Sequence, residues 1–444
     1  MISKLSLPLK ISLPAILLLL AACTTRSTPV QVMDARCGAQ SQACNVLSGS
    51  AGNSIAGGIR GATIAGGGQT GLPNRISGSL GTVGGGDGNT AGEGSTVGGG
   101  SGNTAAHFHA TVGGGNDNLA NAEESSVGGG LKNTAAGRFS TVGGGAANQA
   151  SADYSTVSGG SGNTANYLLS SVGGGTDNLS SSEASVVAGG EHNLAQGPYS
   201  AITGGINNVA SGLGALVGGG AGNTASGLYA LIPGGFSNLA AGDYSFAAGR
   251  SARVDAKHPG AFLFADSNNF PFSSLAPNEF GVRATGGVRF VTAIDPAGAP
   301  LAGVRLSPGS GSWESLSDAQ AKTAITPVDG QQLLARLMSI PVSTWSYRAQ
   351  GASIRHIGPM AQDFYSAFQV GSDNHYISTV DEDGVALAAI QQVYRLVQQD
   401  QARTPAGNAA LAAQVLSLQR QVTTSNALAA AALLVAILAL WRKK

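Results

Sequence analysis

A serine and a lysine lie five residues apart in the stretch 313–322, where they could carry out nucleophilic chemistry. They are Ser317 and Lys322. A serine hydroxyl becomes a nucleophile when a neighbouring group accepts its proton, and a lysine can accept it if burial lowers the pKa of the amine. The spacing alone favours a simpler interpretation, because Ser317 with Gln320 three residues later is also the pattern of a helix capping box. In that interpretation Lys322 is a solvated helix residue.

The chain contains three cysteines, and two of them, Cys37 and Cys44, have six residues between them. In an exported chain two such thiols most often pair, so we predict a disulfide between Cys37 and Cys44. A metal site requires further ligands nearby, and the sequence places none there. We therefore expect neither a metal nor a cofactor.

The middle of the chain has a strict period of fifteen residues. An apolar residue, usually followed by glycines, occupies one position of each repeat, and an asparagine follows five or six residues later. The apolar positions are Val97, Val112, Val127, Val142, Val157, Val172, Val187, Ile202, Val217, Ile232 and Ala247. The asparagines are Asn103, Asn118, Asn133, Asn148, Asn163, Asn178, Asn193, Asn208, Asn223 and Asn238. A period that admits only substitutions predicts stacked, equivalent coils and argues against glycine-rich disorder.

Each coil has room for two short strands and two tight corners. The Thr-Val step predicts a strand with the valine facing inward, and the glycine triplet permits a turn with close backbone approach. We expect the asparagine to take the left-handed corner and its amide to stack on the same amide in the next coil. A second corner contains Gly137, Gly197, Gly212, Gly227 and Gly242, and bulky residues often follow two positions later, at Phe139, Tyr154, Tyr199, Tyr229 and Tyr244. One large apolar residue per coil makes a thin core, so we expect several chains to pack side by side.

In these repeats the chain resembles the head of trimeric autotransporter adhesins, a left-handed parallel β-roll shared by three chains. The resemblance covers about residues 80–249, with irregular turns from about residue 51. It implies a mainly β fold and a homotrimer more than any ligand. Calcium-binding glycine repeats are a rival interpretation, but they need a recurring aspartate, and the aspartates here keep no common position.

Both ends of the chain carry signals for membranes. Lys4 and Lys10 precede an apolar run that ends in Leu20-Ala-Ala-Cys23, which predicts a secretory signal peptide over 1–22. The ending looks like a bacterial lipobox and implies a lipid on Cys23, with sorting to the outer membrane or cell surface. The segment 427–441 is apolar and precedes a basic tail, which favours a membrane-anchor helix, and leucine and valine spacing over 408–425 indicates a short coiled coil.

The period stops after Gly249. We predict a linker over 23–50, repeats over 51–249, a β neck and linker over 250–312, and a different, α+β domain over 313–403. Within the neck, the runs 280–284 and 288–292 flank Thr285-Gly-Gly and predict a hairpin. In the α+β domain we expect helices near 331–338 and 384–399 and a strand near 342–347.

The stretches 313–322, 354–363 and 377–384 resemble, in order, the intramolecular chaperone domain of endosialidases and other phage tail spikes. In that family the domain trimerises the fibre and then cuts itself off with a serine–lysine dyad. Carried over by position, the resemblance implies that Ser317 is the nucleophile, that Lys322 is the general base and that the cut falls between Leu316 and Ser317. His356 and Asp363 lie in a family motif and are auxiliary candidates, although a lone histidine is more often structural. The chain departs from the family pattern at Ala319 and Pro359, which puts the rate of the cut in doubt more than the fold.

These observations together predict a surface-anchored homotrimeric fibre with an adhesin-like head and a self-cleaving assembly chaperone. Charged residues make up 11% of the chain and the net charge is zero, which argues against a nucleic-acid partner. One alternative is an uncleaved trimeric stalk anchored in the membrane. Another is a tail-spike-like protein that binds or degrades glycans, but degradation needs two positioned carboxylates about 5 to 9.5 Å apart, and the glutamates of the repeats keep no common position.

Overall fold

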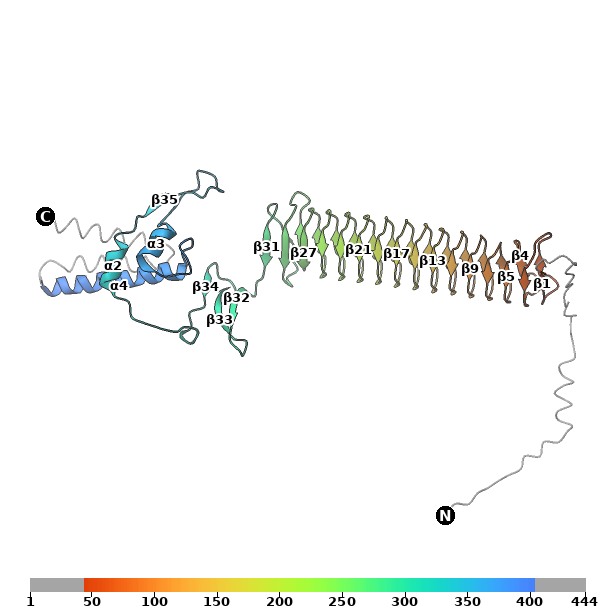
Figure 1. The fold of residues 1–444 in the computed structure, drawn as a ribbon, viewed down its shortest axis with the longest axis horizontal. Coiled ribbons are helices and arrows are strands. Elements are labelled where there is room, and N and C mark those ends of the chain that lie inside the picture. Colours follow the sequence, from red (N-terminus) through yellow and green to blue (C-terminus); the bar gives the residue numbers. More distant parts are fainter. Residues whose placement is uncertain (1–43, 404–444) are drawn as a thin grey trace, which may run out of the picture. The chain divides into compact units, whose positions relative to one another are not determined.

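The computed structural model describes residues 44–403, which form two compact units that meet in sequence between Thr285 and Gly286 (Figure 1). The predicted signal peptide, Cys23, Cys37, the coiled coil at 408–425 and the apolar segment at 427–441 lie outside these residues and stay predictions. Within residues 44–403, no helix combines the length and apolar composition that crossing a membrane requires.

The first unit is a parallel β-solenoid in which each coil gives one strand to each of two long sheets. The sheet of 16 strands contains β1 (Val46–Leu47), β3 (Thr63–Ile64), β5 (Thr82–Val83), β7 (Thr96–Val97), β9 (Thr111–Val112), β11 (Ser126–Val127), β13 (Thr141–Val142), β15 (Thr156–Val157), β17 (Ser171–Val172), β19 (Val186–Val187), β21 (Ala201–Ile202), β23 (Leu216–Val217), β25 (Leu231–Ile232), β27 (Phe246–Gly249), β29 (Phe262–Ala265) and β31 (Phe280–Arg283). The sheet of 15 strands contains β2 (Ser54–Ile55), β4 (Arg75–Ile76), β6 (Thr90–Ala91), β8 (Thr104–Ala105), β10 (Leu119–Ala120), β12 (Thr134–Ala135), β14 (Gln149–Ala150), β16 (Thr164–Ala165), β18 (Leu179–Ser180), β20 (Leu194–Ala195), β22 (Val209–Ala210), β24 (Thr224–Ala225), β26 (Leu239–Ala240), β28 (Ala252–Val254) and β30 (Phe272–Ser273). The predicted mainly β, parallel solenoid fold is confirmed.

The solenoid core is complete within a single chain. The column residues Val97, Val112 and Val127 are each 0% exposed, and the alanines of the second sheet, such as Ala105 and Ala120, are also 0% exposed. The residue before each valine, usually a threonine or serine, faces outward, as strand alternation predicts. The thin core therefore closes within one chain, and the side-by-side packing of several chains, including an adhesin-type head shared by three chains, stays a prediction.

The column asparagines form a buried ladder along the solenoid. The backbone N–H of Asn118 donates to Oδ1 of Asn103 at 3.0 Å, and the same contact recurs from coil to coil. The amide of Asn118 also donates to the carbonyls of Gly114 and Gly130, at 2.9 and 2.8 Å. The predicted ladder is thus confirmed, but the predicted left-handed asparagine is wrong. The positive φ lies on the residue before each column asparagine, for example Asp117 at 56° and Lys132 at 56°, because the column residue must keep its amide pointing inward.

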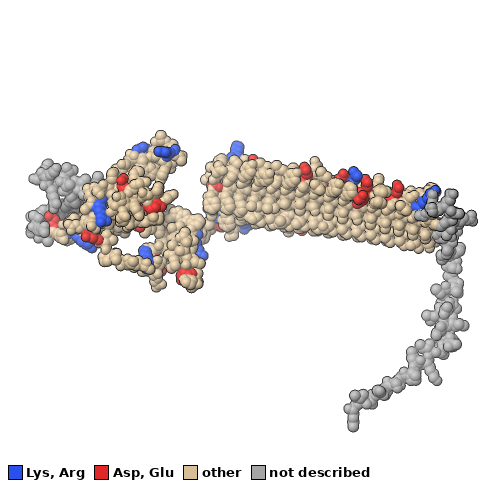
Figure 2. All heavy atoms as spheres, in the orientation of Figure 1, with Lys and Arg blue, Asp and Glu red and all other residues tan. Residues whose placement is uncertain are grey.

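We call the turn that precedes the asparagine (residues 113–118 in one coil) the first corner and the opposite turn (residues 121–125) the second corner. At the second corner the left-handed residue is often a large one, for example Tyr154 with φ 57°. The glycines two positions earlier serve close approach, since a Cβ on Gly197 would collide with the carbonyl of Gly212 in the next coil. Charged side chains of the solenoid gather along one edge of the face that Figure 2 shows, and most of that face is free of them.

The solenoid continues beyond Gly249, so the predicted hairpin over 280–292 is wrong. β29 and β31 stack in parallel on β27. Their coils are longer than fifteen residues, and this change of spacing hides the continuation in the sequence. Stacked rings mark it instead, because Phe262 lies 4.1 Å from Phe246 and 5.0 Å from Phe280, centroid to centroid. Arg283 closes the last coil through an ion pair to Asp266, with 2.9 Å between Nε and Oδ1.

The second unit begins with a small antiparallel sheet that has little core of its own. It consists of β32 (Val288–Ile294), β33 (Pro300–Leu306) and β34 (Trp313–Ser315). Its large apolar side chains are exposed, including Phe290 (52%), Ile294 (62%) and Trp313 (55%). Exposed apolar side chains gathered in this way mark a surface that contacts another one.

The remainder of the second unit is α+β. It contains the 3-10 helix η1 (Ala319–Ala321), the helices α2 (Gly330–Leu337), α3 (Ala361–Phe368) and α4 (Thr379–Arg403), and the two-stranded sheet of β35 (Ser343–Trp345) and β36 (His356–Gly358). Leu333, Phe364, Val385 and Ala389 bring α2, α3 and α4 together in a small core.

Candidate functional site

Ser317 and Lys322 contact each other at the point where the small sheet ends. Nζ of Lys322 lies 2.6 Å from Oγ of Ser317, within hydrogen-bond distance. Five residues of sequence separation do not by themselves bring two side chains together, so the local fold must do so. The contact is the arrangement that proton transfer from a serine hydroxyl to a lysine amine requires.

The single turn of η1 produces this contact. Asp318 is its N-cap and accepts a hydrogen bond from the backbone N–H of Gln320 at 2.9 Å. Lys322 is the C-cap, with an extended backbone. The two residues of the dyad therefore flank one turn and reach across it.

The capping-box alternative for Ser317 is wrong. The cap is Asp318, one residue later, so the hydroxyl of Ser317 does not serve the helix. Lys322 is likewise not inside a helix. The sequence already offered Asp318 as an N-cap, because aspartate is as good an N-cap as serine.

The peptide bond between Leu316 and Ser317 lies between two fixed segments. The N–H of Leu316 donates to the carbonyl of Gly303 at 2.9 Å, which extends the pairing of β33 with β34 by one residue. After Ser317 the chain enters the capped turn. The carbonyl of Leu316 is thus next to the serine hydroxyl in a segment that the sheet and the turn hold on both sides.

Both members of the dyad are exposed to solvent in the single chain. The surrounding residues of the turn, such as Asp318 and Gln320, are exposed as well. A serine–lysine pair in open water lacks the desolvation that makes a lysine amine an effective base. The geometry of the site is present in one chain, and its burial is not.

His356 lies in the hairpin of β35 and β36, where its contacts are with residues other than Ser317 and Lys322. Its ring stacks on Trp345 with 4.8 Å between centroids, and Nε2 lies 2.7 Å from Oε1 of Gln350. These contacts describe a histidine that organises the hairpin. An auxiliary role in the cut stays a prediction.

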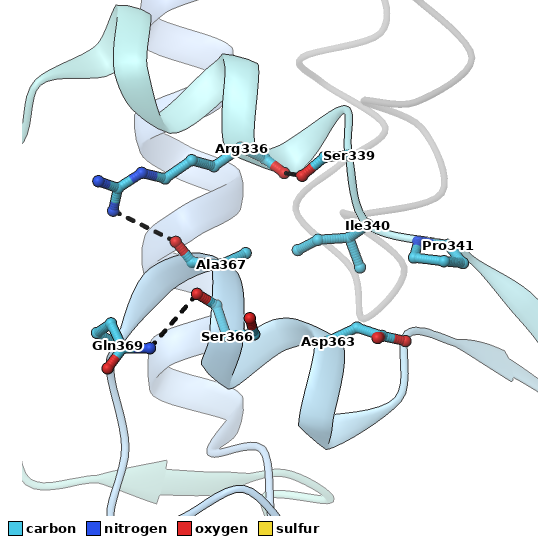
Figure 3. Close-up of a pocket in the computed structure, with 8 residues that line it drawn as sticks. All are labelled: Arg336, Ser339, Ile340, Pro341, Asp363, Ser366, Ala367 and Gln369. Carbon is cyan, nitrogen blue, oxygen red and sulfur yellow. Dashed lines mark hydrogen bonds between the residues drawn. The ribbon is translucent and has the colours of Figure 1, made fainter.

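Asp363 lies in the first turn of α3 and lines an open hollow of about 450 Å³. Figure 3 shows the hollow between the end of α2 and α3, with Arg336 and Ser339 on one side and Asp363 on the other. Arg336 crosses it to donate to the carbonyl of Ala367 at 3.3 Å. No residue of the dyad lines this hollow, and a role for Asp363 in the cut also stays a prediction.

Cys44 is disulfide-bonded. The described part of the chain begins at this residue, so the pairing with Cys37 that the sequence predicts is not tested.

Comparison with known proteins finds one family. A family model described as chaperone of endosialidase, of the class peptidase S74, matches residues 317–370. No curated protein matches the chain. The matched segment begins at Ser317 and includes Lys322, His356 and Asp363. Residues 317–370 are therefore similar to the chaperone of endosialidase, a family linked to self-cleavage, and the similarity starts at the residue that would follow the cut.

Proposed function

We propose that this protein is a surface-anchored homotrimeric fibre whose C-terminal domain directs trimer assembly and then cleaves the chain between Leu316 and Ser317. The family match supports a trimeric, fibre-like protein with an intramolecular chaperone. The observation that carries the self-cleavage is the 2.6 Å contact between Lys322 Nζ and Ser317 Oγ at the first residue of the matched segment.

The cut proceeds in two steps. The amine of Lys322 takes the proton of the Ser317 hydroxyl, and Oγ attacks the carbonyl carbon of Leu316. The peptide C–N bond breaks as the ester C–O bond forms, and the proton passes to the freed amine of Ser317. A water molecule then hydrolyses the ester, which leaves a carboxylate on Leu316 and a new N-terminus at Ser317. Because nucleophile and target are adjacent, the reaction is intramolecular and happens once per chain.

Assembly supplies what the single chain lacks. The dyad lies next to the small sheet, whose Trp313 is 55% exposed, and Leu316 itself is 42% exposed. Neighbouring copies that cover this apolar surface would also exclude water from Ser317 and Lys322. A water-excluded environment favours the neutral amine that a general base requires. The cut would then report that the trimer has formed.

Anchoring is the part of the proposal that rests on sequence alone. A lipid on Cys23 would hold the head at the outer membrane, and residues 427–441 would tether the precursor until Ser317 cuts. Fractionation of cells tests this idea, because a mature head still attached through residues 427–441 would exclude it.

The decisive experiment compares the full chain with two variants, Ser317→Ala and Lys322→Arg, by mass spectrometry and native gel. We expect a wild-type fragment that starts at Ser317 and its absence in Ser317→Ala. Lys322→Arg keeps the charge and the hydrogen bond but removes the base, and general-base losses are about 10²- to 10⁴-fold in rate.

Asp318→Asn is the matched control. It alters the residue between the dyad partners while keeping an oxygen that caps η1, so the cut should persist. If the wild type forms trimers of uncleaved, full-length chains, the proposed cleavage is wrong and the alternative, a permanent trimeric stalk, is favoured. Loss of trimers in Ser317→Ala would show a structural role for the hydroxyl instead.

A further inference from the structure

The two corners of the solenoid have the same backbone conformation and opposite side chains. At the first corner the left-handed residues, with φ between 51° and 56°, are mostly small or polar: Asp117, Lys132, Ala147, Asp177, His192, Asn207 and Ser237. At the second corner the corresponding residues, with φ between 49° and 59°, are more often large: they are His109, Glu124, Phe139, Tyr154, Leu169, Ala184, Tyr199, Tyr229 and Tyr244. Glycine occupies the same positions in other coils, for example Gly222 at the first corner and Gly214 at the second.

The aromatic residues are therefore placed against the local preference. A left-handed backbone disfavours side chains with a Cβ, and Gly, Asn and Asp accept it most easily. The first corner largely follows this preference, so the fold does not demand bulky residues at such a turn. Residues kept in an unfavourable conformation point to a use beyond folding.

The aromatic side chains form three exposed platforms along one edge. The first platform is the stacked pair Phe139 and Tyr154, with 5.0 Å between ring centroids. The third is the stacked pair Tyr229 and Tyr244, with 6.0 Å between centroids. Between them Tyr199 stands alone. The four tyrosines are 52% to 63% exposed, so their rings are accessible to a ligand.

A carboxylate accompanies each platform. The hydroxyl of Tyr199 donates to Oε1 of Glu183 at 3.2 Å. Asp153 precedes Tyr154, and Asp243 precedes Tyr244. Each of these aspartates uses Oδ1 to accept a backbone N–H of the preceding coil, at 2.9 Å in both cases. The second carboxylate oxygen has lone pairs left for hydroxyl donors of a ligand.

We propose that the second corner binds a linear, uncharged polysaccharide that lies along the solenoid axis. Sugar rings present C–H groups on their faces, which pack on aromatic rings, and hydroxyl groups on their edges, which donate to carboxylates. A row of apolar platforms with a few placed polar groups is the composition of such a site.

The charges of the second corner argue against other occupants. Within residues 51–249 its acidic residues are Glu93, Glu123, Glu124, Asp153, Glu183 and Asp243, against Arg60 and Arg138, and the next coil adds Asp255 and Lys257. An acidic edge repels nucleic acid and anionic glycans. It also repels the same edge of a second copy, since like charges across an interface are unfavourable.

The spacing favours a chain over a small sugar. Tyr154 and Tyr199 are three coils apart, and Tyr199 and Tyr229 are two coils apart. Neighbouring strands lie about 4.8 Å apart, which separates the platforms by about 14 Å and about 10 Å. Only a ligand of several sugar units reaches two platforms, so affinity should increase with chain length.

The test uses the full chain in affinity gel electrophoresis with soluble β-glucan, galactomannan and glucomannan, and with polygalacturonate as the anionic comparison. The variant carries Tyr199→Gly, Tyr229→Gly and Tyr244→Gly. Glycine is the residue that a left-handed backbone prefers, and it already stands at the same corner position in Gly214. The variant therefore relieves strain and keeps the fold. The matched control carries His192→Gly, Asn207→Gly and Ser237→Gly, which change the same conformation at the first corner.

We expect at least one neutral polysaccharide to retard the wild type and the control. The tyrosine variant should bind that polysaccharide at least about tenfold more weakly, which is the equivalent of about 1.4 kcal/mol or more. Three outcomes overturn the proposal. They are equal retardation of the tyrosine variant and the control, retardation by polygalacturonate alone, and no retardation of the wild type by any neutral polysaccharide. Sedimentation velocity supplies the last arm, because a lower mass in the tyrosine variant alone would assign this edge to contacts between copies.

Discussion

The two units of this protein bury their apolar residues in opposite ways. Val112 in the solenoid is 0% exposed within one chain, whereas Ile294 in the small sheet of the second unit is 62% exposed. Every coil of the solenoid is covered by the coils before and after it, and only its ends need capping. In the second unit the helices α2, α3 and α4 share a small core, but the small sheet leaves its apolar side chains exposed. The comparison teaches that the solenoid completes its core within one chain, whereas the small sheet of the second unit does not.

This division also explains why a repetitive fibre benefits from a separate assembly domain. Pairing in the solenoid is uniform, since Val127 pairs with Val112 and with Val142 in identical registers. Identical registers give no information on where three chains should align. The non-repeating second unit has a single arrangement of its elements, so it can set that alignment. The following predictions would break or sharpen this contrast.

The largest effect should come from the exposed sheet. We expect the triple variant Phe290→Ser, Ile294→Ser and Trp313→Ser in the full chain to lose trimers, because buried anchor residues at interfaces contribute about 2 kcal/mol or more each. Analytical ultracentrifugation measures the assembly, and circular dichroism should still show the solenoid.

The solenoid offers a control with equal exposure. Leu131, Ile206 and Phe236 are 46%, 46% and 49% exposed at the first corner. Serine at these three positions should leave the trimer unchanged. If this control dissociates and the sheet variant does not, the contrast between the units is reversed.

The second prediction concerns the asparagine ladder. Asn163 accepts the N–H of Asn178 at 3.0 Å and donates to the carbonyls of Gly159 and Gly175 at 2.9 and 2.8 Å. Asn163→Ala leaves the buried N–H of Asn178 without this acceptor, which costs about 1–3 kcal/mol, and it also removes the two hydrogen bonds to the half-buried glycine carbonyls. Hydrogen exchange should accelerate in the adjacent coils, with Thr164→Ala on the outer face as the comparison. Unchanged exchange in Asn163→Ala would show that the ladder is dispensable.

A smaller and opposite effect is expected at Ala147. Its φ is 56°, a conformation that glycine adopts without a steric cost. Ala147→Gly should therefore raise the free energy of unfolding by about 1 kcal/mol or less, while Ala146→Gly one residue earlier should lower it. Chemical denaturation measures both. Destabilisation by both changes would contradict the assigned turn.

The smallest effect should appear with acid at the end of the solenoid. Hydrogen bonds from the side chain and backbone of Thr285, together with Arg283 and Asn268, hold the pKa of Asp266 well below its usual range. A carboxyl with a depressed pKa in the folded state adds stability above the ordinary aspartate value of about 4, and this contribution is lost as the pH falls below it. Between pH 6 and pH 3, the protection of the last coil against hydrogen exchange, measured relative to the intrinsic exchange rate at each pH, should therefore decrease in the wild type. Asp266→Asn should show a flatter response, and an identical slope in both proteins would disprove the role of Asp266.

The repeat made the solenoid predictable because every coil gives the same evidence. The inward valines and the asparagine ladder follow from the period alone. The position of the left-handed residue at the first corner does not follow from the period. Asp117 and Asn118 tolerate that backbone equally well, and only tertiary hydrogen bonds decide between them. The last coils were missed because their length changes after Gly249, which removes the period while the strand pairing continues.

The candidate site was predictable only in part. Resemblance, and not spacing, pointed to Ser317 and Lys322, and the structure then brought the two side chains together. The sequence did not reveal that Asp318 caps η1, because Ser317 fits the same cap pattern. Nor could it reveal the exposure of the dyad, since burial depends on which surfaces meet in space.

The uniform register of the solenoid has a consequence for inheritance. Column asparagines such as Asn148 make the same contacts fifteen residues away on either side, so the loss or duplication of one whole repeat rejoins chemically identical ends. Point substitutions change the surface of the fibre but not its length. Recombination between repeats in the gene changes its length by whole coils, without any new core having to evolve.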